Sequence, residues 1–305
     1  MNAIEACNLR KSFGPVRAVD DVSITVKEGE IFGFLGQNGA GKTTAIRMMT
    51  GVLTPDTGTV QIGGIDLLKH PLEAKLKMGV IPENGTVYSD LTAEQNILWT
   101  AKFYGMDKKS REEKCTAILT RLGLIHRRYD PVRFFSKGMR QRVSIACAIV
   151  HSPPVLFLDE PTTGLDVYSR RLVLDTVRYM NTEGSTVLIT THNIEEASEL
   201  CSSISIINNG KIIETGTPEK LKKKFDTERY VEISFDQPVS GEVFGMHGIA
   251  RAEPHGDKWR VYTENTDAAV KALVSLGGAE HLTILSIATS SPTLEQAFVQ
   301  MTGGT

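Results

Sequence analysis

Hydrophobic and polar residues alternate along the first part of the chain in a way that predicts short strands around one helix. Apolar positions recur at every second residue over 22–26, which indicates a strand with one buried face. A nearly continuous apolar run over 30–35 indicates a buried strand, and positions 42–50 have helical spacing. Gly51 follows, and glycine most easily takes the left-handed conformation that ends a helix. The pattern therefore predicts a strand, a loop and a helix between residues 30 and 51.

The rest of the first 220 residues alternates between β-branched runs and segments with three- and four-residue hydrophobic spacing. The predicted strands cover 4–9, 59–62, 78–81, 155–158, 186–189, 203–207 and 211–214. The predicted helices cover two segments between 92 and 122, with a break at 105–110, and the segments 143–150, 170–180 and 194–200. Strands that alternate with helices indicate an α/β domain with a mainly parallel sheet.

A change in composition near the basic run 222–224 marks the start of a second part of the chain. We interpret this run as the solvated end of a helix rather than as a binding site. Strands are predicted over 231–235, 259–262 and 282–288, and a helix over 267–276 that ends at the two glycines 277 and 278. A last helix is expected after Ser291 and Pro292. The predicted domains are 1–224 and 225–305, the second a small α+β domain.

Composition narrows the classes of protein to consider. Of the 305 residues 41% are apolar and 23% charged, as in an ordinary globular protein, and the net charge of −2 gives no bulk attraction for nucleic acid. No run of 18 apolar residues and no signal peptide is present, so we expect a cytoplasmic chain. The four cysteines are widely separated, and we expect buried, reduced thiols.

The loop between the predicted strand and helix carries the first candidate chemistry. It fits the phosphate-binding pattern G-x-x-x-x-G-K-[ST], in which glycines let the backbone approach a phosphate. Its lysine reaches the β- and γ-phosphates of a nucleotide, and its threonine hydroxyl holds Mg²⁺. A glycine-rich turn that matches by chance is the alternative, and the order of strand, loop and helix argues against it. The candidate nucleotide-binding residues are Gly36, Gln37, Asn38, Gly39, Ala40, Gly41, Lys42, Thr43 and Thr44.

An acidic pair, Asp159 and Glu160, follows the predicted strand 155–158. Phosphoryl transfer needs a group that tethers the metal and a group that orients or deprotonates the attacking water. Asp159 suits the first role and Glu160 the second. Taken alone, the pair could equally end a strand in a solvated turn, but it stands downstream of a phosphate-binding loop.

Four further stretches resemble ATP-binding-cassette (ABC) proteins in the family's order and spacing. Residues 135–142 resemble the signature motif, 164–166 the D-loop and 190–192 the segment of the switch histidine. Phe13 stands where the family has an aromatic residue that stacks on adenine. The resemblance covers residues 1 to about 220 and implies a P-loop NTPase cassette of the α/β class. Such a cassette has a RecA-like mixed sheet with an antiparallel β subdomain and a helical subdomain, here at about 84–150.

The resemblance also implies roles for site residues. Glu160 and His192 would be catalytic, and Thr43 and Asp159 would hold Mg²⁺, Asp159 through water. Ser136 and Gly138 would meet the γ-phosphate of ATP bound to a second copy. The family normally has glutamine where Glu83 stands, so Glu83 is a further candidate for Mg²⁺, with a solvent-facing side chain as the alternative. A carboxylate at this position would add negative charge near the γ-phosphate, which puts the rate of ATP hydrolysis in question but not ATP binding.

The family's mechanism implies partners. Two copies would close head to tail around two ATP molecules and drive separate integral-membrane permease subunits, contacted at about residues 84–105. Residues 291–299 resemble the last helix of the ATPase subunits that serve bacterial ABC-2-type exporters. This resemblance implies a C-terminal domain that supports or regulates the dimer, with an inert packing domain as the alternative. The implied location is peripheral, on the inner face of a bacterial or archaeal cell membrane.

Two other classes of function remain open on the sequence. A cassette ATPase that acts on ribosomes or DNA usually has tandem cassettes or a long coiled-coil insert, whereas this chain has one phosphate loop and no heptad run. A regulatory ATP sensor with weak hydrolysis is the second alternative, and Glu83 is the residue that suggests it.

Overall fold

The computed structural model describes residues 1–83, 85, 87–224 and 229–290. The chain forms two compact units, which divide after Pro218 and each have a buried hydrophobic core. This division lies a few residues before the limit set from the sequence, and the domain limits 1–224 and 225–305 remain predictions.

The first unit contains a six-stranded sheet that is parallel except for one edge strand. Its order is β10-β9-β3-β8-β7-β6, and only β10 runs antiparallel to its neighbour. Every residue of β3, β7 and β8 is buried, which explains their continuous apolar runs. The strands are β3 (Ile31–Leu35), β6 (Met78–Ile81), β7 (Val155–Asp159), β8 (Thr186–Thr191), β9 (Ser203–Asn208) and β10 (Lys211–Gly216). The expected mainly parallel sheet is confirmed.

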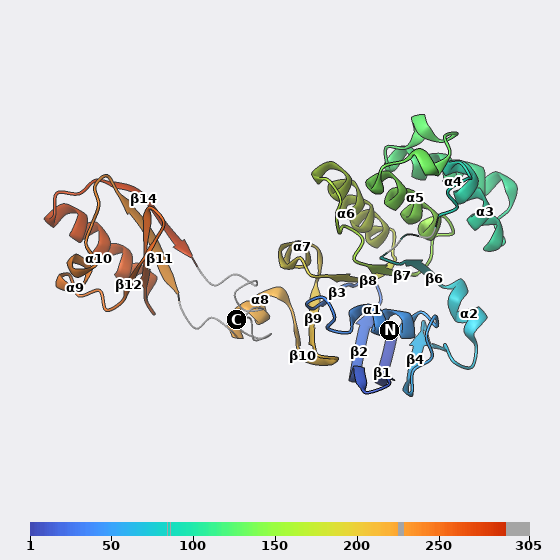
Figure 1. The fold of residues 1–305 in the computed structure, drawn as a ribbon, viewed down its shortest axis with the longest axis horizontal. Coiled ribbons are helices and arrows are strands. Elements are labelled where there is room, and N and C mark those ends of the chain that lie inside the picture. Colours follow the sequence, from blue (N-terminus) through green and yellow to red (C-terminus); the bar gives the residue numbers. More distant parts are fainter. Residues whose placement is uncertain (84, 86, 225–228, 291–305) are drawn as a thin grey trace. The chain divides into compact units, whose positions relative to one another are not determined.

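A second, antiparallel sheet packs on the other side of helix α1 (Lys42–Met49), which lies between the two sheets (Figure 1). Its order is β2-β1-β4-β5. The strands are β1 (Asn2–Phe13), β2 (Val16–Lys27), β4 (Thr57–Ile62) and β5 (Ile65–Asp66), and the short helix α2 (Pro71–Leu76) follows. Strands β1 and β2 extend beyond their predicted ranges. The hydrophobic pattern missed their outer ends because these are charged and lack the apolar alternation.

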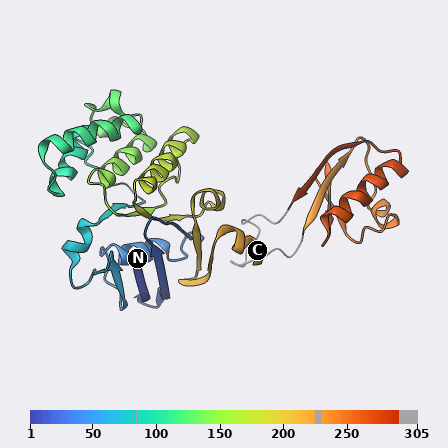
Figure 2. The same ribbon diagram turned by 180° about the vertical axis from the view of Figure 1, so that it is seen from behind.

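Of the remaining helices of the first unit, α3, α4 and α5 lie together toward the β6 end of the parallel sheet, whereas α6 packs against β8 and α7 against β3 and β8 (Figures 1 and 2). These helices are α3 (Ala93–Phe103), α4 (Lys108–Arg121), α5 (Lys137–Ile149), α6 (Val167–Thr182) and α7 (Ile194–Leu200). Helix α8 (Pro218–Lys224) follows, and the division between the two units falls after its first residue. The predicted start of α5 at residue 143 was wrong by six residues. The Ser136 side chain accepts a hydrogen bond from the Met139 N–H and caps the helix, so a polar first turn belongs to it.

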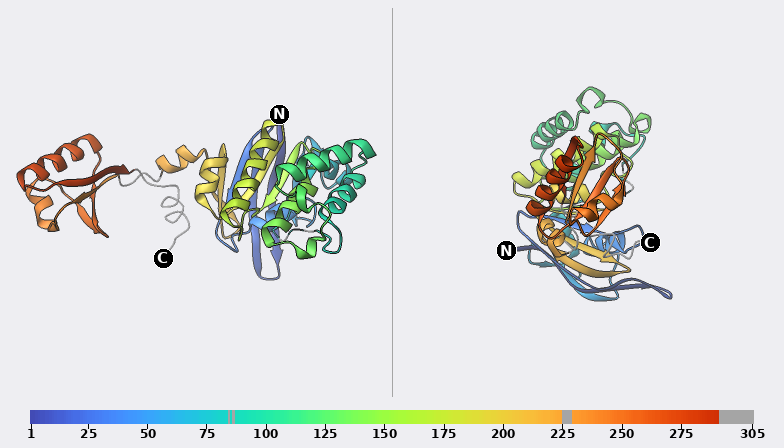
Figure 3. Two further views of the ribbon diagram at one scale, coloured as in Figure 1. Left: turned by 90° about the horizontal axis from the view of Figure 1, so that it is seen from above. Right: turned by 90° about the vertical axis from the view of Figure 1, so that its left-hand side faces the viewer.

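The second unit is an antiparallel sheet covered on one face by helices α9 and α10 (Figures 2 and 3). Its strand order, β12-β13-β11-β14, and its element order give a split β-α-β pattern. Val231, Ile233 and Phe235 lie in its core, as their shared strand face predicted. The elements are β11 (Tyr230–Phe235), α9 (Gly241–Met246), β12 (Ala252–His255), β13 (Lys258–Tyr262), α10 (Thr266–Ala279) and β14 (Ile284–Ser290).

Gly277 and Gly278 do not end α10, which continues to Ala279. A Cβ at Gly277 would lie 3.3 Å from the Leu282 carbonyl oxygen, so this glycine allows close packing, and His281 takes the left-handed conformation instead. Cys7 is exposed, contrary to the expectation of buried thiols. The helix predicted after Ser291 lies outside the described residues.

Candidate functional site

The loop from Gly36 to Gly41 joins β3 to α1, and its glycines are required by its shape. Gly39 and Gly41 have φ angles of 83° and 108°, in the region that disfavours other residues. A Cβ at Gly41 would lie 2.4 Å from the Ala18 carbonyl oxygen, and a Cβ at Gly36 would lie 2.6 Å from the Ile207 carbonyl oxygen. The loop therefore fits against β2 and β9 only with glycine at these positions.

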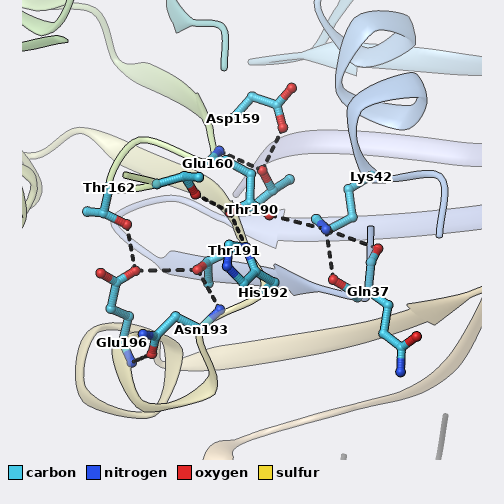
Figure 4. A network of polar contacts seen from close by, with 12 residues as sticks. Gln37, Lys42, Asp159, Glu160, Thr162, Thr190, Thr191, His192, Asn193 and Glu196 are labelled. Carbon is cyan, nitrogen blue, oxygen red and sulfur yellow. Dashed lines mark hydrogen bonds and ion pairs between the residues drawn. The ribbon is translucent and has the colours of Figure 1, made fainter. Parts of the chain in front are cut away.

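Lys42, the first residue of α1, is 5% exposed and reaches back over the loop. Its Nζ donates to the carbonyl oxygens of Gly36 at 2.7 Å and Gln37 at 3.2 Å, and it lies 3.1 Å from Oε1 of Glu160. Figure 4 shows Gln37 from the loop after β3, Lys42 from α1 and Glu160 from just after β7. The lysine predicted to bind phosphate and the carboxylate predicted to act on water are direct neighbours.

Glu160 follows β7 and has an unusual backbone conformation, with φ at +50°. Such a conformation costs energy in a residue other than glycine, and here hydrogen bonds hold it. The Glu160 N–H donates to Oγ1 of Thr190 at 2.9 Å, and the same hydroxyl donates to Oδ1 of Asp159 at 2.7 Å. One threonine of β8 thus fixes both members of the acidic pair.

His192 lies just after β8 and contacts the same carboxylate. Its Nδ1 is 2.8 Å from Oε2 of Glu160, which also accepts a hydrogen bond from the Thr163 hydroxyl at 2.9 Å. Burial raises the pKa of Glu160, but Lys42, Thr163 and His192 together lower it more, so the pKa lies below the usual value. Glu160 is therefore ionised at neutral pH.

A cavity of about 270 Å³ opens beside these residues and contains much of the predicted site. Glu83 is exposed yet borders the cavity, as does Glu160. The lining residues are Ala18, Gln37, Asn38, Gly39, Gly41, Lys42, Thr43, Thr44, Glu83 and Glu160. The phosphate loop and two carboxylates therefore share one space.

Other predicted site residues lie outside this lining. Phe13, at the end of β1, is 52% exposed, and Asp159 is buried at the end of β7. Ser136 and Gly138 lie at the N-terminus of α5, where a Cβ on Gly138 would lie 2.6 Å from the Ser169 hydroxyl oxygen. The structure of one copy does not bring Ser136 or Gly138 into the cavity.

The family model described as "ABC transporter" matches residues 19–163. The linearmycin resistance ATP-binding protein LnrL of Bacillus subtilis is 33% identical over 311 residues, which cover 99% of each chain. The chain belongs to the ABC transporter ATP-binding protein family. The resemblance inferred from the sequence motifs is confirmed, and the protein is an ATPase of this family.

Two further matches agree with this assignment. The Nod factor export ATP-binding protein I of Ralstonia nicotianae is 33% identical, over 97% of this chain and 92% of that protein. A solved ATP-binding subunit of an ABC transporter is 30% identical with a TM-score of 0.69, and the match covers 73% of this chain and 93% of that one. The expected P-loop cassette fold is confirmed. Among the helices described here, none combines the length and hydropathy needed to cross a membrane.

The sequence reasoning missed several residues around this ABC ATPase site. Thr190 and Thr191 lie within the segment of the switch histidine but received no role, and Thr162 and Glu196 were not singled out. All four are buried and hydrogen bonded next to the acidic pair or the histidine. The threonines near the ends of two strands could have indicated this network, because buried hydroxyl groups need hydrogen-bond partners.

Proposed function

We propose that this protein is the ATP-hydrolysing subunit of an exporter, in which two copies close around two ATP molecules and drive separate membrane permease subunits. The observation that carries the proposal is the convergence of Lys42, Glu160 and His192 at the phosphate loop. One relative that spans nearly the whole chain is named for Nod factor export and another for linearmycin resistance. These names support export, and the membrane subunits would select the cargo.

The loop residues would hold ATP together with Mg²⁺. Lys42 and the backbone N–H groups at the start of α1 would bind the β- and γ-phosphates, and Phe13 would stack on adenine. Mg²⁺ in nucleotide sites is usually held by one or two carboxylates together with the phosphates of the nucleotide. Thr43, Asp159 through water and Glu83 are its proposed ligands. When bound, Mg²⁺ neutralises phosphate charge.

Glu160 is the proposed general base. Its lowered pKa keeps the Glu160 side chain ionised, so that it can accept the proton of the attacking water. His192 contacts Oε2 of the same carboxylate and holds it in place. Lys42 lies against Oε1 of the same group. Binding of ATP would therefore give the Lys42 ammonium a second anionic partner beside Glu160, which couples nucleotide binding to the position of the base.

The second copy completes the site in this proposal. Ser136 and Gly138 would face the γ-phosphate bound to the partner. The first turn of α5 contains Lys137 and no acidic residue, and a helix N-terminus of this kind favours an anion. ATP would bind the closed pair better than separate copies and so shift the population toward closure. Because the two copies are identical, the closed pair would have two-fold symmetry.

The proposed permease contact is the aromatic surface of α3 and the loop before it. Tyr88, Trp99 and Phe103 are 64%, 54% and 71% exposed, and the Trp99 and Phe103 rings pack edge to face. Exposed aromatic residues in one patch are typical of protein contacts. This contact would hold the protein on the cytoplasmic face of the membrane.

Turnover at different protein concentrations tests the two-copy mechanism. The specific ATPase activity of the purified protein should rise with protein concentration and then level off, because only pairs have complete sites. A specific activity that stays constant down to concentrations at which light scattering finds only monomers would contradict the proposal.

Co-purification with the membrane subunits tests the permease contact. The double variant Trp99→Ala/Phe103→Ala should lose co-purification and keep the ATPase activity of the isolated protein. Tyr129→Ala is the matched control, since Tyr129 is 68% exposed and lies outside α3, between α4 and α5. Loss of the partner in the control alone, or retention in the double variant, would refute the assigned surface.

A regulatory ATP sensor is the second candidate, and the position of Glu83 at the cavity favours it. Two carboxylates beside one phosphate site oppose the approach of a γ-phosphate. Glu83→Gln should then raise turnover several-fold, while Glu73→Gln, which removes the same charge from the exposed face of α2, should not. Tight ATP binding with turnover at background would establish the sensor instead of the exporter ATPase.

A further inference from the structure

Glu196 is a buried carboxylate that links three segments around the site. It lies in the first turn of α7 and is 3% exposed. Its Oε2 accepts hydrogen bonds from the hydroxyls of Thr162 at 2.8 Å and Thr191 at 3.3 Å. Figure 4 shows it on the side of Thr191 away from Lys42. The Nε of Arg170, on α6, lies 2.5 Å from Oε1.

The sheet alone does not fix the two residues that act on ATP. The pairing of β7 with β8 ends at Asp159 and Thr190, and Glu160 and His192 both lie beyond their strands. The 2.8 Å contact between Glu160 and His192 thus joins two segments that have left the ladder. The Thr162–Glu196–Thr191 bridge is a further link between the same segments, in addition to the hydrogen bonds from the Glu160 N–H to Thr190.

Arg170 extends this bridge to the other end of the loop that follows Glu160. Segment 161–166 includes Thr162 near its start and ends at Asp166. The Asp166 side chain caps α6 by accepting a hydrogen bond from the Ser169 N–H at 2.8 Å. Arg170 lies one turn into that helix and pairs with Glu196. Both ends of the segment are therefore tied to the first turn of α7.

We propose that Glu196 is a positioning residue for ATP hydrolysis, which sets the approach of Glu160 to His192 and the course of segment 161–166. The inference rests on the proposed hydrolytic role of Glu160. Glu196 touches neither the cavity nor the two catalytic candidates, so it acts through Thr162 and Thr191. A buried carboxylate is costly to desolvate, and here one arginine, two hydroxyls and a helix N-terminus compensate it.

Steady-state kinetics of matched variants tests the proposal. Glu196→Gln removes the charge at nearly constant volume, and Thr162→Val removes one hydroxyl of the bridge. Each should lower kcat by roughly tenfold and leave the KM for ATP within about twofold, because the phosphate loop is unchanged. Glu195→Gln, at the exposed neighbouring position of the same helix turn, should change neither constant. If Glu196 had only a structural role, its variant would show a lower melting temperature and a smaller fraction of active protein, but the kcat per active molecule would not fall.

The double variant Glu196→Gln/Thr162→Val sharpens the result. If both residues act through one contact, the double variant should lose no more kcat than the more impaired single variant. Folded Glu196→Gln protein with kcat within twofold of the wild type would overturn the proposal. A kcat loss in Glu195→Gln equal to that in Glu196→Gln would also overturn it.

Hydrogen exchange without nucleotide separates this inference from the proposed function. Amides of segment 161–166 should exchange at least several-fold faster in Glu196→Gln and at the wild-type rate in Glu195→Gln. If the wild-type protein hydrolyses no ATP, the proposed function fails, and the exchange result alone decides whether the bridge holds the segment. Unchanged exchange in Glu196→Gln would refute the bridge.

Discussion

The Nζ of Lys42 lies 3.1 Å from Oε1 of Glu160, and both side chains are less than 10% exposed. The pair joins the start of α1 to the end of β7 beneath the phosphate loop. Burial raises the pKa of Glu160, but the Lys42 ammonium is among the groups that lower it below its usual value, so the carboxylate stays ionised. The residue assigned to phosphate and the residue assigned to water are therefore linked before any nucleotide chemistry occurs.

Lys42→Ala should abolish ATP binding. The variant removes the cation assigned to the β- and γ-phosphates, and it leaves the Glu160 carboxylate next to them. Equilibrium binding of a fluorescent ATP analogue should show an affinity loss of about 100-fold or more. Arg47→Ala, on the exposed side of the same helix, is the control and should bind as the wild type does. Unchanged affinity in Lys42→Ala would refute the assignment of the loop.

Thiol labelling should distinguish one cysteine from the other three. Burial raises the pKa of the Cys115 and Cys201 thiols to about 12 and that of Cys147 to about 11, while Cys7 is exposed. Because the thiolate is the reactive form, a bulky maleimide at pH 7.5 should label one site in the native protein and four in denaturant. Cys7→Ser should abolish native labelling, and a second fast site would contradict the packing described here.

Acid should destabilise the first unit through His151. The ring stacks on Tyr104 at 3.5 Å between centroids, its Nε2 is 3.1 Å from the Met78 carbonyl oxygen, and burial lowers its pKa from 6.5 to about 4. The unfolded chain then binds a proton that the folded chain does not. Stability is therefore full above pH 6.5 and falls as the pH drops from 6.5 to 4. The maximum loss is ~3 kcal/mol, reduced by the partial exposure of the ring.

The variant His151→Phe tests this because it keeps the stacked ring and removes the titration. Urea unfolding should be followed by Trp99 fluorescence in a Trp259→Phe background, so that the signal reports the first unit alone. Between pH 6.5 and 4 the free energy of unfolding should fall more steeply in the protein with His151 than in the variant. Parallel pH dependences would show that His151 is not the responsible group.

The sequence allowed prediction of those parts of the site whose residues are adjacent in the chain. The phosphate loop and the pair Asp159 and Glu160 have fixed spacing, so a pattern search finds them. Glu196 could not be found this way, because its partner Thr162 is 34 residues away and the contact exists only once β7 pairs with β8.

Local rules also failed where packing decided the structure. Gly277 looked like a helix end, since glycine favours that position, yet α10 passes through it because Leu282 and Ile284 pack closely there. The polar first turn of α5 hid that helix's start, which the Ser136 cap defines. In both cases a tertiary or capping contact outweighed the hydrophobic pattern.

Light scattering of Glu160→Gln with saturating ATP and Mg²⁺ tests the central claim most directly. This variant should keep ATP binding, lose hydrolysis and accumulate as a pair of chains with two bound ATP molecules. Its measured mass should be twice the 33.4 kDa of one chain, and Lys42→Ala should stay monomeric under the same conditions. A mass of one chain for Glu160→Gln, with ATP demonstrably bound, would contradict the account.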